Sequence, residues 1–130
     1  MNDIYISDNF KLSEFESPDT KEIKINEELV DKLEQLRKKV NDKSDIDDEI
    51  GLIINSAYRT PEHNKSVGGV DNSQHLKGDA ADVSLNNLPY DADSMEGIAE
   101  EIGFNGIGKY NTFIHLDVRD NGQARWDNRA

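Results

Sequence analysis

The sequence of 130 residues contains no cysteine and no long apolar run. Without cysteine, the protein can form neither disulfides nor thiolate metal sites, and redox chemistry gives no indication of its compartment. No segment approaches the roughly 20 consecutive apolar residues that span a bilayer. We therefore do not expect a membrane protein, and the fold must be held together by packing.

Positive charge is also scarce. Lys and Arg number 15 against 27 Asp and Glu, which gives a formal charge of −12 at pH 7. Binding to a phosphate backbone requires clustered Lys and Arg that release counterions, so nucleic acid is not an expected partner. The same charge disfavours diffuse attraction to polyanionic surfaces, and a polymeric substrate would have to be recognised locally.

The first ten residues lack the features of a secretory signal peptide, because they contain neither a basic start nor a continuous apolar run. We expect synthesis in a cytoplasm, and retention there unless another route releases the protein. Hydrophobic residues make up 35% of the chain and charged residues 32%, which is typical of a small soluble globule. The length predicts one domain, residues 1–130, which we expect to be monomeric.

Apolar residues at helical spacing predict two amphipathic helices. The first begins after Asn26 and continues to about Val40, and its basic end suits the helix dipole. The second runs from about Asp91 to Ile102 and ends before Gly103.

Two shorter helical segments are predicted from capping residues. Ser13 is expected to cap a turn that carries Phe15 and packs as a lid over the core. Thr60 and Pro61 have the pattern of an N-cap and a first helical residue, and the short helix that follows should end before Gly68.

Apolar runs predict four strands, at residues 52–58, 80–85, 104–108 and 112–118. The last two form a hairpin that turns through residues 109–111. The acidic run at residues 42–49 lacks the glycine of an EF-hand loop, and we predict a solvated loop there. Helices segregated from a small, mostly antiparallel sheet define an α+β fold class.

Two histidines and an aspartate are candidate metal ligands. Gly78 allows a tight turn between His75 and Asp82, so one unit of loop and strand can deliver both side chains to one site. Together with His115, they offer the nitrogen and oxygen atoms that zinc accepts, and three protein ligands leave a fourth position for water. The residues therefore predict a catalytic zinc site. The alternative for His75 is a loop histidine that hydrogen-bonds the backbone.

Strand alternation places Phe113, His115 and Asp117 on one face of the last predicted strand. Asp117 then has two candidate roles. It can accept a hydrogen bond from the distal nitrogen of His115, or it can act as general base towards a metal-bound water. The alternative is a carboxylate in an ordinary ion pair with Lys or Arg.

Other polar residues lie near these ligands in the sequence. Arg59 follows an apolar strand and can bind a substrate carboxylate through two parallel hydrogen bonds, although an acidic chain also favours a structural ion pair. We assign His63 to a capping or surface role, and Ser73 to bracing its loop through the hydroxyl. A serine nucleophile formed by Ser73 and His75 is disfavoured, because the sequence has no nucleophile elbow.

Several separated motifs resemble, in order, those of the zinc D-Ala-D-Ala peptidase family, which has the hedgehog/DD-peptidase fold. The likeness covers roughly residues 12–119. It is carried by Ser56-Ala-Tyr58-Arg59-Thr-Pro61-Glu-His-Asn64, Val67-Gly-Gly69, Ser73-x-His75-x-x-Gly78-x-Ala80-x-Asp82, Gly103-Phe-x-Gly106-Ile-Gly108-x-Tyr110 and His115-x-Asp117.

The resemblance implies a zinc peptidase of the D,D-carboxypeptidase or endopeptidase type that acts on peptidoglycan stem peptides or crosslinks. It further implies that His75, Asp82 and His115 bind Zn²⁺ and that Arg59 lies near the substrate carboxylate. Some relatives have Glu or His two or three residues before the last ligand, where this chain has Phe113 and Thr112. Asp117 is then the candidate base, and a mechanism that relies on zinc and Arg59 alone stays open.

A small wall hydrolase without a signal peptide or an evident wall-binding module resembles phage or prophage lysins, which reach the cell wall after release or as part of a phage particle. The alternative function is a catalytically weak or inactive module of the same fold that binds cell-wall peptides.

Overall fold

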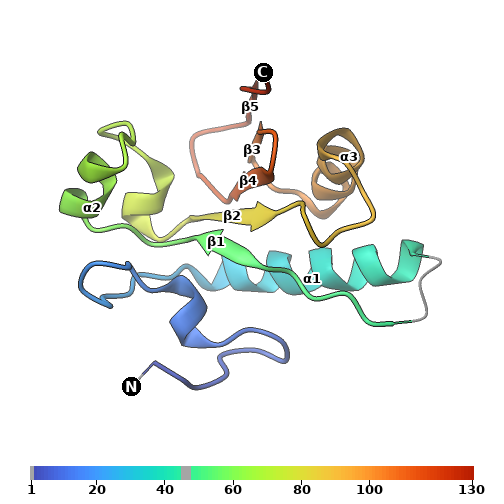
Figure 1. The fold of residues 1–130 in the computed structure, drawn as a ribbon, viewed down its shortest axis with the longest axis horizontal. Helices are drawn as coiled ribbons and strands as arrows, with labels where there is room; N and C mark the ends of the chain where they lie inside the picture. Colours follow the sequence, from blue (N-terminus) through green and yellow to red (C-terminus); the bar gives the residue numbers. More distant parts are fainter. Residues whose placement is uncertain (1, 45–47) are drawn as a thin grey trace.

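The computed structural model describes residues 2–44 and 48–130. These residues form a five-stranded sheet with the strand order β1-β2-β4-β3-β5 (Figure 1). Neighbouring strands are antiparallel, except that β5 runs parallel to β3. The strands are β1 (Ile54–Ser56), β2 (Ala80–Ser84), β3 (Gly106–Lys109), β4 (Phe113–Asp117) and β5 (Ala124–Asp127). With its flanking helices, this sheet confirms the predicted α+β class.

The helices of the described residues are α1 (Glu27–Lys43), α2 (Pro61–Ser66) and α3 (Ala92–Ile102), together with the short 3-10 helices η1 (Leu12–Phe15) and η2 (Gln74–Lys77). Asn26 caps α1 by accepting a hydrogen bond from a backbone N–H, and Asp91 caps α3 in the same way. Gly103 ends α3 at a φ of 103°, in the left-handed region that favours glycine. Both predicted amphipathic helices are confirmed. None of the helices described is long and apolar enough to cross a membrane.

The hydrophobic core joins one face of the sheet to the apolar sides of α1 and α3. Val83 of β2, Ile107 of β3 and Ile114 of β4 are fully buried in it. The core residues of the two helices are Leu29, Val30, Leu33, Leu36, Val40, Met95, Ile98 and Ala99. Burial of this apolar area is the main favourable contribution to folding that a chain without disulfides has available.

The amino-terminal segment differs from its prediction. Phe10 and Phe15 are each only 1% exposed and pack edge to face, so this segment is part of the core and not a lid over it. Ser13 lies inside η1 and is not its cap. Instead, Lys11 precedes the helix, and its backbone N–H donates to Glu14 Oε2 at 2.7 Å.

The observed strands differ from the predicted ones in two places. The predicted strand at residues 52–58 is paired as a strand only in β1, because the backbone beyond it bonds elsewhere: Tyr58 N–H donates to the Phe15 carbonyl and Arg59 N–H to that of His75. Strand β5 was not predicted at all. The predicted loop at residues 42–49 lies partly outside the described residues, and its first two residues belong to α1.

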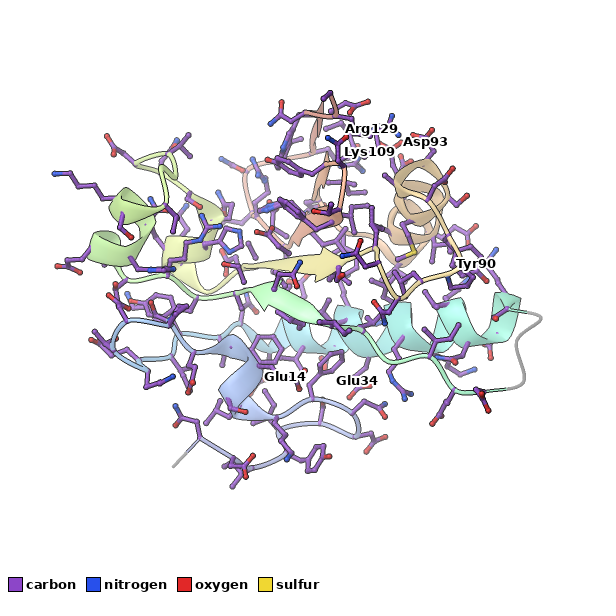
Figure 2. All side chains as sticks on the ribbon, in the orientation of Figure 1. Glu14, Glu34, Tyr90, Asp93, Lys109 and Arg129 are labelled. Carbon is purple, nitrogen blue, oxygen red and sulfur yellow. The ribbon has the colours of Figure 1, made fainter. Side chains whose placement is uncertain are left out.

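Ion pairs attach the carboxy-terminal segment to α3. Lys109 at the end of β3 pairs with Asp93 at 3.0 Å and with Glu96 at 3.2 Å, and Arg129 pairs with Asp93 at 3.1 Å (Figure 2). Arg129 and Lys109 share Asp93, and the Asn128 backbone N–H donates to the Lys109 carbonyl at 2.8 Å, so the chain beyond β5 lies beside the β3–β4 turn.

The second face of the sheet carries polar side chains, and two glycines of β3 make room for them. In the register of the sheet, Gly106 lies opposite Asp117, and Gly108 lies between His115 and Trp126. A Cβ at Gly106 would strike the Asp117 carboxylate, and one at Gly108 would strike the Trp126 indole. The spacing of glycines in β3 is therefore explained by the side chains of its two neighbouring strands.

Replacing Gly106 by alanine should destabilise the protein, because the new methyl group competes with a buried carboxylate. We expect the Gly106→Ala variant to lose about 1–3 kcal/mol, measured by chemical denaturation. Gly97→Ala is the matched control, since Gly97 is an exposed residue of α3 with nothing within 4 Å of an added Cβ. It should gain about 0.5–1 kcal/mol from helix propensity. An unchanged free energy of unfolding in Gly106→Ala would contradict the packing described here.

Candidate metal centre

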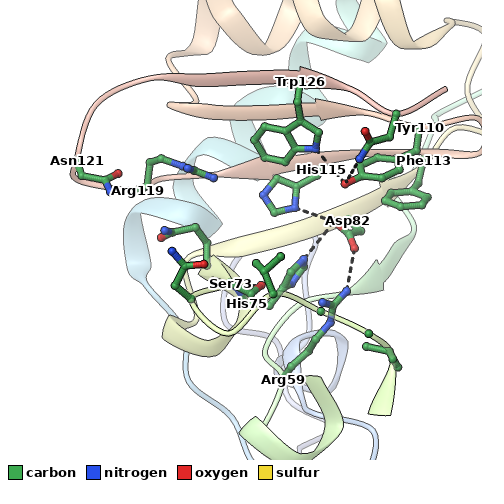
Figure 3. Close-up of a pocket in the computed structure, with 17 residues that line it drawn as sticks. Arg59, Ser73, His75, Asp82, Tyr110, Phe113, His115, Arg119, Asn121 and Trp126 are labelled. Carbon is green, nitrogen blue, oxygen red and sulfur yellow. Dashed lines mark hydrogen bonds and ion pairs between the residues drawn. The ribbon is translucent and has the colours of Figure 1, made fainter. Parts of the chain in front are cut away.

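The three candidate ligands converge at one point on the polar face of the sheet. Asp82 of β2 lies directly opposite His115 of β4, and η2 brings His75 to the same place. Asp82 Oδ1 is 3.3 Å from His75 Nε2 and 3.0 Å from His115 Nδ1 (Figure 3). Ligand atoms around a tetrahedral zinc ion lie roughly 3.3 Å apart, because the bonds to zinc are about 2.0–2.1 Å long. This spacing fits a shared metal ion.

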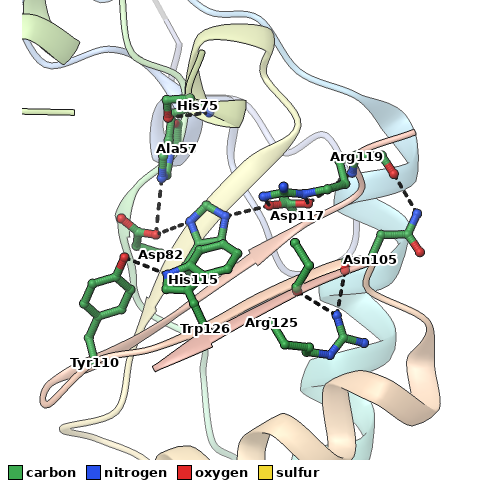
Figure 4. Close-up of polar contacts among 12 residues, drawn as sticks. Ala57, His75, Asp82, Asn105, Tyr110, His115, Asp117, Arg119, Arg125 and Trp126 are labelled. Carbon is green, nitrogen blue, oxygen red and sulfur yellow. Dashed lines mark hydrogen bonds and ion pairs between the residues drawn. The ribbon is translucent and has the colours of Figure 1, made fainter. Parts of the chain in front are cut away.

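Hydrogen bonds orient both imidazoles. His75 Nδ1 lies 2.6 Å from the Ala57 carbonyl oxygen, and His115 Nε2 lies 2.7 Å from Asp117 Oδ2 (Figure 4). Because each of these partners accepts a hydrogen bond, each nitrogen carries the ring proton. In the neutral form of each ring, the lone pairs of His75 Nε2 and His115 Nδ1 therefore point at Asp82, which is the arrangement found around metal-binding histidines.

The local sequence explains how His75 reaches the site. Ser73 caps η2, and its hydroxyl oxygen accepts a hydrogen bond from the His75 backbone N–H at 3.2 Å. Gly78 ends the helix at a φ of 75°, and a Cβ there would strike the backbone of Lys24. The prediction that Ser73 braces this loop is confirmed. The alternative prediction for His75 was a loop histidine that hydrogen-bonds the backbone. It also describes part of the geometry, because Nδ1 of His75 does bond the backbone.

The electrostatics of the cluster favour a bound cation. All three side chains are buried, with exposed fractions of 3% for His75, 6% for Asp82 and 7% for His115. Burial disfavours the charged form of Asp82, but the hydrogen bonds that His115 and His75 donate when their rings are protonated outweigh it and hold the pKa of the carboxyl well below its usual range. Burial likewise lowers the pKa of His115, but the hydrogen bonds that the protonated ring donates to Asp117 and Asp82 outweigh it and raise that pKa. Positive charge between these groups is thus stabilised.

Asp117 lies behind the cluster and is fully buried. Besides the contact with His115, its two oxygens accept hydrogen bonds from Arg119 Nε at 2.8 Å and Arg119 Nη2 at 2.7 Å. Burial opposes ionisation, but the Arg119 hydrogen bonds outweigh it and keep the pKa of Asp117 well below its usual range. Both oxygens are occupied, and Asp117 does not line the cavity. The geometry therefore matches the hydrogen-bond acceptor role, which is one of the two roles predicted for Asp117.

The ligand cluster forms part of the wall of a cavity of about 530 Å³. Arg59 lines this cavity while its guanidinium contacts Ser56 at 3.2 Å, Asn64 at 3.2 Å and Asp82 at 3.5 Å. It is thus held as an ion pair and also faces the space where a ligand would bind. His63 does not line the cavity, and its backbone N–H donates to the Thr60 cap.

Sequence reasoning did not single out an aromatic wall of the cavity as functional. Tyr110 and Phe113 stack with ring centroids 4.3 Å apart, and the Trp126 ring lies 5.0 Å from that of His115. Gly108 could have indicated the position of Trp126, because a glycine in a strand often makes room for a bulky neighbouring side chain. The neighbour could not be identified from the sequence, since β5 was not predicted. Asn64 was likewise missed as the residue that holds both Arg59 and the Val70 carbonyl.

Comparison with known proteins agrees with this geometry. The family model of Peptidase M15 matches residues 8–117, which include the cluster, Arg59 and Asp117. No curated protein matches the chain. The family match covers most of the sequence and confirms the resemblance drawn from its motifs. The chain therefore belongs to the peptidase M15 family, the family of the zinc D-Ala-D-Ala peptidases.

Proposed function

We propose that this protein is a zinc peptidase that hydrolyses amide bonds of peptidoglycan stem peptides or their crosslinks, with His75, Asp82 and His115 as the zinc ligands. The observation that supports it most is the convergence of these three groups in a chain of the M15 family, with each imidazole oriented from behind. Zinc bound there would lower the pKa of a bound water to about 7 and polarise the scissile carbonyl.

Asp117 and Arg119 act as positioning residues in this proposal. Asp117 fixes the tautomer of His115, and Arg119 keeps Asp117 ionised by two hydrogen bonds from its guanidinium. Asp117 thereby increases the basicity of the nitrogen that faces the metal. Arg59 stands on the cavity side of Asp82 and can bind a carboxylate or a developing negative charge of the substrate.

The reaction then proceeds without a strong carboxylate base. Among the described residues, Asp82 is the only Asp or Glu that lines the cavity, and Phe113 lines it where some relatives have an acid. We infer that activation of water depends on the metal and that charge stabilisation depends on Arg59. The lack of a base also favours the second candidate, a module of the same fold that binds stem peptides without turnover.

The lining of the cavity supports a peptide substrate with a carboxylate. Its cationic groups are Arg59 and Arg119, although the whole chain is strongly acidic. Amide side chains complete the lining: Asn72, Gln74, Asn121 and Asn128. Amides can donate to and accept from peptide groups. As a monomeric wall hydrolase of the phage or prophage type, the protein would act on the wall after release or as part of a phage particle.

Digestion of purified peptidoglycan tests the activity and identifies the bond. Zinc-loaded protein should release new free amino groups, and mass spectrometry of the products should show one type of stem-peptide or crosslink bond cut. Release of a terminal amino acid indicates a carboxypeptidase, and cleavage within crosslinks indicates an endopeptidase. Wall binding with intact peptides would instead support the binding module.

Removal of one imidazole should abolish zinc binding, because two ligands do not hold the ion against water. We expect one zinc per chain in the wild type and well under a tenth of that in His75→Ala and His115→Ala after dialysis, measured by elemental analysis. His63→Ala is the matched control, since His63 is the third histidine and does not line the cavity; it should keep its zinc. Full zinc content in His75→Ala would refute the ligand assignment.

Asp117→Asn separates the two roles considered for Asp117. As a positioning residue, it should cost about 10–100-fold in zinc affinity, measured by competition with a chelator, while turnover at saturating zinc largely survives. The opposite pattern, unchanged zinc affinity with loss of most turnover, would restore Asp117 as the general base.

A further inference from the structure

The hydroxyl of Tyr110 has a hydrogen to donate and no protein acceptor for it among the residues that the structure describes. A phenol oxygen accepts two hydrogen bonds and donates one. At Tyr110, both acceptor positions are used, by Trp126 Nε1 at 2.9 Å and by Asn128 Nδ2 at 3.4 Å. The hydroxyl can therefore make one further hydrogen bond, in which it is the donor. Because Tyr110 lines the cavity, the acceptor can be a bound ligand.

The position of the hydroxyl is fixed by its surroundings. The Tyr110 ring stacks on Phe113 at an interplanar angle of 11°, and the Tyr110 backbone N–H donates to the Phe113 carbonyl at 3.1 Å. Trp126, which holds the oxygen, is itself confined by the space above Gly108 and by Arg119, 5.5 Å from its ring. The donor is therefore preorganised, which is the condition under which a hydrogen bond contributes most to catalysis.

The hydroxyl also faces the candidate metal centre. Figures 3 and 4 both place the Tyr110 oxygen between the Trp126 indole and the Asp82 carboxylate. Figure 3 further shows Arg59 on the other side of Asp82. Two hydrogen-bond donors thus flank the ligand cluster, one cationic and one neutral.

We propose that Tyr110 is a catalytic residue whose hydroxyl donates a hydrogen bond to the carbonyl oxygen of the scissile amide and stabilises the negative charge that forms there. This inference rests on the proposed peptidase function. It also explains the Gly106-Ile-Gly108-x-Tyr110 motif. The glycines make room for Asp117 and Trp126, and Trp126 positions the Tyr110 hydroxyl.

The chemical step balances without proton transfer from Tyr110. The oxygen of water forms a bond to the carbonyl carbon, and the π electrons of the carbonyl move to its oxygen, which gains the charge that Tyr110 and Arg59 stabilise. When the carbonyl re-forms, the bond between carbon and nitrogen breaks, and the proton lost by water passes to the leaving amine. Tyr110 keeps its proton throughout.

Tyr110→Phe tests the donor, since it removes one oxygen and keeps the ring that stacks on Phe113. We expect kcat/KM to fall about 10²–10³-fold with unchanged zinc content, as for the loss of one oxyanion donor. Calorimetry with a phosphinate analogue of the cleaved bond should show a similar loss of affinity, whereas affinity for the reaction product should change by less than about threefold. Tyr5→Phe is the matched control, because Tyr5 is 65% exposed and does not line the cavity; it should behave as the wild type.

A second variant separates the donated hydrogen from the Trp126 contact. Trp126→Phe removes the indole N–H that positions the Tyr110 hydroxyl but leaves the hydroxyl itself, so kcat/KM should fall by clearly less than in Tyr110→Phe. The inference would be overturned, while the peptidase proposal stands, by any of three results. These are an equal fall of kcat/KM in both variants, an equal loss of affinity for the phosphinate and for the product in Tyr110→Phe, or a Tyr110→Phe variant as active as the wild type. A wild type that cleaves no bond would overturn both.

Discussion

The antiparallel register of β2 and β4 places Asp82 opposite His115, and the candidate site depends on this pairing. A slip of one residue would turn Asp82 towards the hydrophobic core and Val83 towards the cavity. The buried residues Ala81, Val83, Ile114 and Leu116 hold the register, because each of them would lose its apolar surroundings in such a slip. The core therefore fixes the geometry of the polar face that lies on its other side.

On that face, polar groups in direct contact form a continuous series. Arg119 pairs with Asp117, Asp117 bonds His115, and His115 and His75 both meet Asp82. Each negative group is buried next to a donor, which is the condition for keeping a carboxylate ionised away from water. A cation held by His75, His115 and Asp82 would complete the series. Gly106 has no side chain and so leaves space for the Asp117 carboxylate. A glycine of β3 therefore allows a charged side chain of β4 to be buried.

Sequence patterns predicted α1, α2, α3 and the turn at η1, most of the sheet and the set of residues that meet at the cluster, but not η2, which carries His75. The amphipathic periods of α1 and α3 carry strong signals because each helix buries one side. Strand β5 carried no such signal: Ala124–Asp127 is at most half-buried, includes two charged residues, and pairs with a distant strand in parallel. The role of Asp117 could not be chosen from sequence either, since it depends on whether the side chain faces the cavity or Arg119.

If His75, Asp82 and His115 share one zinc ion, X-ray absorption spectroscopy of the zinc-loaded protein should detect all three side chains around the metal. The spectrum should show four nitrogen or oxygen ligands at about 2.0–2.1 Å, with outer-shell scattering from two imidazole rings. A six-coordinate spectrum without imidazole scattering, typical of a loosely held hydrated ion, would show that these three residues do not bind the zinc ion together.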